Sequence, residues 1–348
     1  MKKSIYISSL LALFAAPVFA QDIHFSQFYM SPLTLNPAMA GAQHEIQTLF
    51  NYKSQWQSVT NPYKTLGFSY DMRLNRKKDE KGIIAAGINF FSDRAGDGKM
   101  GTTQANLSLS YHARLNSDNL LGGGLQAGYF QRSLNFSALY WGSQYDGTSF
   151  NTSYISGEPV NGTSNFSAPD FGAGIAWTYD NSANSNSVTG DNDLKFNLGL
   201  SAMHVNQPGY SFYQAEGKLP MKYTVHGTGL IGMKNSNLAF VPGFMYMKQG
   251  DAQEIYAGTL LRYTMGMDSK YTGFKNGAAL SLGGFMRAKD ALSAVVMFEY
   301  ANYSMGFSYD INTSGLTAAS NGRGGIEIAL RFISPNPFLG KKSVSSFN

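Results

Sequence analysis

From residue 45 to residue 334 the chain consists of short blocks in which apolar residues alternate with small or polar ones. In the last block Ile326, Ile328 and Leu330 alternate with Glu327 and Ala329. A period of two residues is typical of a β-strand whose two faces meet different surroundings. The pattern predicts an all-β fold of about fourteen strands, at residues 45–55, 63–74, 82–91, 101–115, 119–133, 168–180, 193–205, 221–234, 237–248, 253–266, 276–287, 291–301, 303–312 and 323–333.

Such blocks occur in soluble β-sandwiches and in transmembrane β-barrels, and the composition favours a barrel. The face opposite the apolar one is rich in Gly, Ser and Ala, whereas a solvated sandwich face would be rich in Lys and Glu. Only 14% of the residues are charged, against about 25% in an average soluble domain. Tyr and Trp gather toward the block ends, as they do at membrane interfaces. We therefore expect a transmembrane antiparallel barrel with apolar residues toward lipid and small or charged residues toward the lumen.

The start of the chain has the pattern of a secretory signal peptide. Lys2 and Lys3 precede an apolar stretch, and small residues lead up to Ala20. We expect cleavage after Ala20, with a retained anchor as the alternative. Cleavage would leave 25 of the 27 basic residues against 22 acidic ones, a net charge of +3. The predicted location is the cell outer membrane, and the predicted parts are a signal peptide (1–20), an N-terminal plug-like segment (21–44), the barrel (45–334) and a periplasmic C-terminal tail (335–348).

Residues 21–44 alternate poorly and do not resemble a strand. Pro32 and Pro37 disfavour regular structure, yet Phe25 and Phe28 are too apolar for a solvated tail. A wide barrel has a lumen that is either water-filled or plugged. We therefore expect this segment to fold into the lumen as a partial plug, with a disordered periplasmic tail as the alternative.

Charged residues on the predicted lumen face form a candidate site. Because their signs are mixed, we expect them to pair across strands and tether the plug rather than to line a substrate path. A generic wet lumen is the alternative. The residues are Asp71, Arg73, Arg114, Arg262, Arg287, Glu299, Asp310, Glu327 and Arg331.

The longest predicted connection, residues 134–167, is the fifth, which places it outside the cell if both chain ends are periplasmic. Its aromatic residues stand among Ser, Gly and Asn, a composition typical of adaptable binding loops. It either contacts a secreted partner or folds over the barrel mouth. The candidate partner-binding residues are Tyr140, Trp141, Tyr145, Phe150 and Tyr154.

Motifs for catalysis and cofactor binding are scarce. Residues 227–232 have the spacing G-x-G-x-x-G, but no helix follows, so we interpret these glycines as small residues facing the lumen. The five histidines show no metal-ligand spacing. No pair of a nucleophile and a base is apparent. We predict no catalytic residue, no metal and no cofactor, and the scattered basic residues predict no nucleic-acid partner.

The stretch Gln21–Gly41, QDIHFSQFYMSPLTLNPAMAG, resembles the mature start of the PorP/SprF family, outer-membrane proteins associated with type IX secretion and gliding in Bacteroidota. The likeness continues through Asn51–Trp56, with Lys53 where the family usually has Arg, and reaches Gly324–Ile328. The residues that carry it include Phe25, Ser26, Gln27, Phe28, Asn36, Pro37, Gly41 and Trp56.

The resemblance implies a barrel similar to the fatty-acid-transporter type, in contact with outer-membrane lipid and without enzymatic activity. It implies partners among type IX secretion or gliding components, or a specific large secreted adhesin held through the adhesin's C-terminal targeting domain. The alternative function is an outer-membrane transporter or channel for hydrophobic small molecules, by analogy of barrel type. That alternative predicts a continuous apolar channel, which the charged lumen positions weaken.

Overall fold

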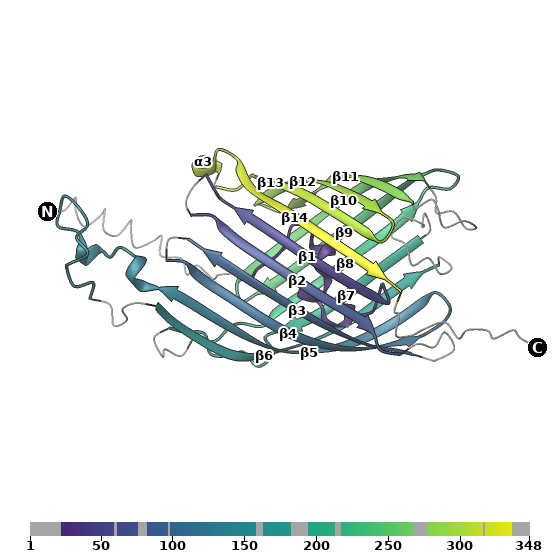
Figure 1. Ribbon diagram of the computed structural model, residues 1–348, viewed down its shortest axis with the longest axis horizontal. Coiled ribbons are helices and arrows are strands. Elements are labelled where there is room, and N and C mark those ends of the chain that lie inside the picture. Colours follow the sequence, from purple (N-terminus) through teal and green to yellow (C-terminus); the bar gives the residue numbers. More distant parts are fainter. Residues whose placement is uncertain are drawn as a thin grey trace, which may run out of the picture.

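The computed structural model describes residues 22–58, 61–75, 82–96, 98–157, 163–181, 194–212, 217–266, 277–315 and 317–335. They form a closed antiparallel barrel of fourteen strands, in which β1 pairs with β14 (Figure 1). No helix among these residues is long and apolar enough to cross a membrane. The strands are β1 Ile46–Gln55, β2 Tyr63–Arg73, β3 Gly82–Ala95, β4 Met100–Arg114, β5 Asn119–Asn135, β6 Thr163–Asp180, β7 Leu194–Met203, β8 Lys222–Gly232, β9 Leu238–Gln249, β10 Ala252–Gly266, β11 Ala278–Arg287, β12 Ala291–Tyr300, β13 Tyr303–Asn312 and β14 Arg323–Ser334.

The predicted barrel and its strand count are confirmed, and the largest boundary error is at β6. That strand begins at Thr163 rather than at residue 168. Residues 164–167 alternate between partly buried and exposed positions, but two of them are Ser and one is Asn. Where both faces of a strand lie beyond lipid, polar residues occupy both, so hydropathy alone does not reveal the strand.

The predicted division of the strands into two faces holds, with two corrections. Leu292 and Val296 on β12 are exposed to the surroundings, while Val295 and Met297 are buried in the lumen. Part of the lumen is therefore apolar, contrary to the prediction of small and charged residues alone. Two glycines of residues 227–232, Gly227 and Gly229, were also misassigned. A Cβ on Gly227 would meet Phe244 and Leu198, both exposed on the outer face, so this glycine faces outward.

The two ends of the barrel differ in their connections. The end at which β1 finishes carries the long connections 136–162 and 204–221, and we call it the loop end. At the other end β1 begins and β14 finishes. Outer-membrane barrels keep their longer loops outside the cell, so we expect the loop end to be extracellular.

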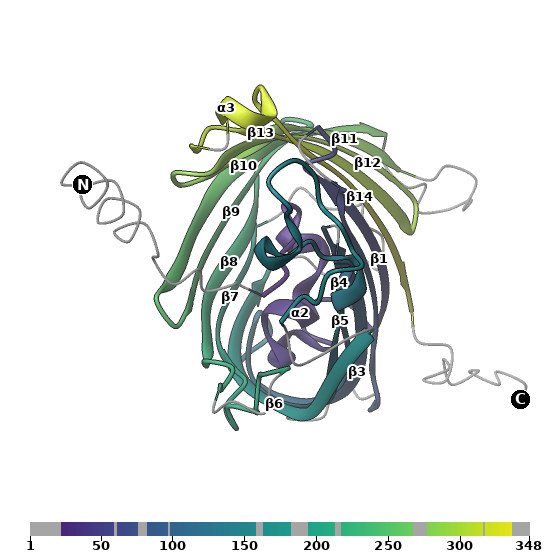
Figure 2. The ribbon, with the colours of Figure 1, turned by 90° about the vertical axis from the view of Figure 1, so that its left-hand side faces the viewer.

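Residues 22–44, called the lumen segment from here on, lie inside the barrel (Figure 2). Asp22 lies at the loop end, where its side chain contacts Lys222 at the start of β8. Gly41 lies at the opposite end, where its N–H donates to Asp71. The segment therefore spans the lumen, and its first described residue lies at the loop end. The predicted signal peptide 1–20 and tail residues 336–348 lie outside the described residues.

The lumen segment contains three short helical turns: η1 Phe28–Met30, α2 Pro32–Leu35 and η2 Pro37–Met39. Pro32 and Pro37 each occupy the first residue of a turn. Proline suits this position, since its fixed φ is helical and its missing N–H would have no intrahelical partner. The two prolines thus begin helical turns, although the sequence suggested that they would prevent regular structure.

Candidate functional site

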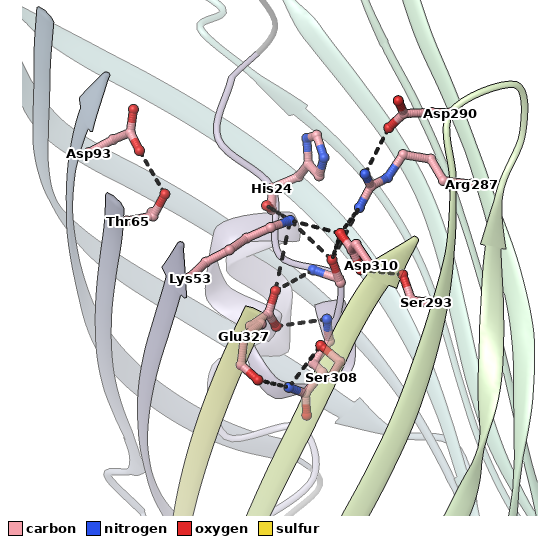
Figure 3. A network of polar contacts seen from close by, with 12 residues as sticks. His24, Lys53, Thr65, Asp93, Arg287, Asp290, Ser293, Ser308, Asp310 and Glu327 are labelled. Carbon is pink, nitrogen blue, oxygen red and sulfur yellow. Dashed lines mark hydrogen bonds and ion pairs between the residues drawn. The ribbon is translucent and has the colours of Figure 1, made fainter. Parts of the chain in front are cut away.

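Glu327 on β14 holds the start of η1. Its two carboxylate oxygens accept the backbone N–H groups of Ser26 and Gln27 at 2.7 and 2.8 Å (Figure 3). Both amides precede the helical turn at Phe28, so the carboxylate fills the role of an N-capping group at the positive end of the turn. Glu327 is 1% exposed. This contact explains why an acidic residue stands on the lumen face of β14.

Ser26 joins the lumen segment to a buried ion cluster. Its hydroxyl donates to Asp310 at 2.8 Å and lies 3.0 Å from Lys53 Nζ and 3.1 Å from Arg287 Nη2. Both cations also pair with Asp310, at 3.8 and 3.3 Å. A buried ion pair is tolerable only when its remaining polar atoms find partners. Ser26 supplies one such partner to three charged groups at once.

Lys53 is the residue whose role the sequence did not reveal. Its Nζ donates to the backbone oxygen of His24 at 3.2 Å and lies 3.9 Å from Glu327. Register explains the pairing, because Lys53 and Glu327 face each other where β1 closes the barrel against β14. The sequence signal that could have revealed this role is the place of Lys53 on the lumen face of the first strand, where a charge needs a partner.

A second group closes the other end of the segment. Asp71 accepts the N–H of Gly41 at 2.8 Å, and Arg73 donates to the carbonyl oxygens of Gly41 and Ala42 at 2.7 and 3.2 Å. These carbonyls follow η2, where a cation complements the negative end of a helical turn. The barrel wall therefore presents the Glu327 carboxylate to the N–H groups before the first turn of the segment. It presents the Arg73 guanidinium to the carbonyl groups after the last turn.

The other predicted charges are arranged differently. Arg262 Nε pairs with Glu299 at 2.6 Å, and Arg331 lies 3.9 Å from the same carboxylate, so these three residues link strands of the wall. Arg114 faces the lumen, but its Nε has no hydrogen-bond partner among the described residues. The nine predicted charges thus form separate groups rather than one network.

The loop end has a charge cluster that the sequence analysis missed. Asp22 lies 2.9 Å from Lys222 and 2.6 Å from His204 Nε2, while His204 Nδ1 lies 2.8 Å from Asp170. Burial lowers the pKa of His204, but the two carboxylates outweigh it and raise the pKa to about 9. The histidine was considered only as a metal ligand. Among the described residues, no group of three or more such side chains could hold a metal.

Apolar and close backbone contacts fix the middle of the segment. Phe28 packs edge to face on Tyr256 and Phe285, with ring centroids 5.8 and 5.9 Å apart. Asn36 Nδ2 donates to the backbone oxygens of Ile175 and Leu200 at 2.9 and 3.2 Å. Its Oδ1 accepts the N–H of Ala38 within η2, at 2.9 Å. The segment therefore contacts wall strands on several sides of the lumen.

The connection after β5 stands at the loop end and carries exposed aromatic rings. The Phe150 ring lies 5.4 Å from that of Tyr140 and 5.2 Å from that of Tyr145, and all three are exposed, as is Tyr154. Trp141 is partly buried and stacks on Phe136. The predicted binding residues thus divide into an exposed set and one anchoring ring.

The model of the family "Type IX secretion system membrane protein PorP/SprF" matches residues 18–332. The chain belongs to this family. Its location in the outer membrane follows from the family and from the barrel. A search of curated proteins finds no match.

Several solved barrels have a similar course of the chain. The deltaS2 mutant of the monoaromatic hydrocarbon channel TodX is 11% identical, with a TM-score of 0.47 over 86% of this chain and 93% of that chain. The KdgM porin is 9% identical, with a TM-score of 0.34 and coverages of 82% and 99%. BamA from Haemophilus ducreyi lacking POTRA domains 1–3 is 10% identical, with a TM-score of 0.39 and coverages of 83% and 71%.

The residues that carried the family resemblance occupy two places in this PorP/SprF member. Trp56 follows β1 at the loop end and packs edge to face on Tyr63, with centroids 4.7 Å apart. It was grouped with the plug residues, but it lies outside the lumen segment. The others are buried in the lumen: Phe25, Ser26, Gln27, Phe28, Asn36, Pro37 and Gly41.

Proposed function

We propose that this PorP/SprF protein is a non-enzymatic binding protein, whose lumen segment plugs the barrel and whose loop after β5 holds a secreted partner. The supporting observation is the exposed aromatic surface formed by Tyr140, Tyr145, Phe150 and Tyr154. Exposed apolar patches outside lipid commonly mark interaction sites. Tyr140 is 67% exposed.

The base of this loop supports binding because it is packed against the rest of the loop end. Phe136 lies 6.0 Å from Phe212, and Phe166 lies 4.9 Å from the same ring. Arg132 lies over the Tyr210 ring at 4.6 Å. A surface held in advance loses less conformational entropy on binding.

The partner of this surface is a component of the type IX system or a large secreted adhesin, engaged through the adhesin's C-terminal targeting domain. The family supports the first of these, and the extracellular position of the loop supports the second. Lipid is the other partner, because an apolar belt covers the outer face of the strands.

A channel for hydrophobic small molecules finds little support in this barrel. The lumen segment buries charged wall residues such as Glu327 and Lys53, each 1% exposed. An apolar hollow of about 850 Å³ does exist, but Leu109, Leu125 and Ile175, which line it, belong to the outer face. A channel would require displacement of the segment.

The test is to replace Tyr140, Tyr145 and Phe150 together by Ser in a tagged barrel purified from secreting cells. We expect the co-purifying exported protein to be lost, while heat-modified migration on gels remains that of the wild type. Thr148→Ala, in the same loop, is the matched control and should retain the partner. If the triple variant retains the same exported protein, the aromatic surface is not the binding site.

A further inference from the structure

The hairpin of β5 and β6 extends beyond its neighbour at the loop end. β6 runs from Thr163, but its pairing with β7 begins only at Gly172. Its pairing with β5 continues without a bulge to the pair of Asn135 and Thr163. Among the described residues, the outer half of β6 is therefore paired on one side only. Figure 1 shows β5 and β6 reaching far out at the loop end.

The orientation of the unpaired backbone groups follows from the last contacts on that side. Phe171 donates its N–H to Asn206 at 3.2 Å and accepts from the N–H of Val205 at 3.0 Å. The Pro169 carbonyl accepts from Asn206 at 2.8 Å. Since alternate residues of a strand point the same way, the N–H and C=O groups of residues 167 and 165 also point away from β5. No described residue forms a hydrogen bond with them.

Within the part of the chain that the structure describes, this edge has no paired strand, and its pairing with β5 has no bulge. Asn165 and Ser167 are exposed and uncharged. Proteins usually protect a free edge with charges, prolines or bulges, and here Pro169 alone stands at the inner end of the stretch. On the other face, Phe166 packs 5.6 Å from Tyr210 and so fixes the strand in place.

We propose that an extended segment of the exported partner adds to β6 along Asn165–Ser167 and continues the sheet outside the membrane. This inference rests on the proposed function and specifies how the partner is held. Main-chain hydrogen bonds to a free edge give affinity that depends little on the partner's sequence. The exposed rings of the same hairpin would then select side chains.

A second copy of the barrel does not fit this edge. In a parallel ladder the N–H and C=O groups of one residue bond to two residues of the partner strand that lie above and below it, so identical edges can pair only after a shift of one residue along the strands. Two copies in one membrane both point outward and are related by rotation about the membrane normal. Rotation leaves residue 167 of both copies at the same depth, so N–H would face N–H, and the shift that a ladder needs is absent.

The decisive experiment uses a photo-crosslinking amino acid at position 165 or 167 of the full-length protein in secreting cells. A strand ladder has a fixed register, so moving the probe by two residues should move the crosslinked position in one partner segment by two residues. Gln131, exposed on β5 one strand from the edge, is the control position and should crosslink weakly. Crosslinks to a second copy, or crosslinks without this shift, would overturn the proposal.

Two substitutions separate this inference from the proposed function. Ser167→Pro removes the outward N–H, and Pro169 shows that the strand accepts proline in this orientation. Ser167→Ala keeps the N–H, and both variants lose the hydroxyl that bonds Tyr129. We expect Ser167→Pro to lower crosslinking from position 165 about tenfold and Ser167→Ala to leave it near the wild-type yield. If Ser167→Pro has no effect while the triple aromatic variant loses the partner, only the strand addition fails. If neither variant has an effect, both proposals fail.

Discussion

Replacing Glu327 by Gln should loosen the lumen segment without breaking the barrel. The carboxylate accepts two backbone N–H groups, from Ser26 and Gln27. A glutamine side chain has one acceptor oxygen, so its NH₂ group would face the second amide. The variant therefore loses a charge-assisted hydrogen bond and leaves one buried N–H without an acceptor.

The size of the effect follows from these two losses. A hydrogen bond to a charged group contributes about 1.5–3 kcal/mol, and a buried unsatisfied donor costs about 1–3 kcal/mol. Partial rearrangement around Lys53 reduces the total, which leaves about 2–3 kcal/mol of weaker binding of the segment. At 1.4 kcal/mol for each factor of ten, the displaced state becomes roughly 30- to 150-fold more populated.

The assay is single-channel recording of purified barrels in planar bilayers. We expect Glu327→Gln to open far more often than the wild type, and deletion of residues 22–44 to set the upper limit of conductance. Glu299→Gln is the matched control, because Glu299 pairs with Arg262 across the wall at 2.6 Å. It should lower the heat-unfolding temperature with little change in opening. Equal opening of the wild type and Glu327→Gln, or an equal rise in both variants, would refute this account.

Three further predictions address other contacts of the segment. A Cβ on Gly124 would clash with the backbone nitrogen of Ala38, while one on Gly123 would meet nothing within 4 Å, so Gly124→Ala should lower the heat-unfolding temperature and Gly123→Ala should not. The pKa of His204, about 9, exceeds the ordinary 6.5, so its stabilising effect is complete below pH 6.5 and is lost as the pH rises toward 9. Proteolysis of the segment should therefore increase over that range, and His204→Gln should remove the dependence. An epitope inserted directly before Asp22 should bind antibody on intact cells, whereas binding only after the outer membrane is broken would contradict the course of the segment.

The strands could be predicted from the sequence because lipid imposes a local rule. Each outward residue of β12 or β13 must be apolar, and that requirement appears as alternation in the sequence itself. Lumen-facing residues obey no such local rule, because the contacts of each one depend on which strands and which part of the lumen segment lie near it in the closed barrel. Val295 and Met297 gave a local sign, because residues 294–298 are apolar on both faces. Phe28, which belongs to the same buried cluster, could not be found from periodicity.

The polar contacts of the segment were beyond prediction for the same reason. Ser26 meets Asp310 and Arg287, which come from strands near the end of the chain, while Asn36 meets β6 and β7. Such pairings follow only from closure of the barrel and from the depth at which each turn of the segment lies. Asp22 stands outside the alternating blocks and His204 stands near the end of the predicted strand 193–205, so no pattern related them.

The arrangement of these contacts separates closure of the lumen from binding at the loop end. Removal of the segment would leave Lys53, Arg287 and Glu327 facing an open lumen, where water would replace Ser26 and the two amides as their partners. The wall charges are therefore suited to a filled lumen, and mixed signs match the donors and acceptors of one chain better than a passing solute. None of these residues belongs to the exposed part of β5, β6 or their connection. A variant that opens the barrel and still retains the partner, together with one that loses the partner and stays closed, would demonstrate that separation directly.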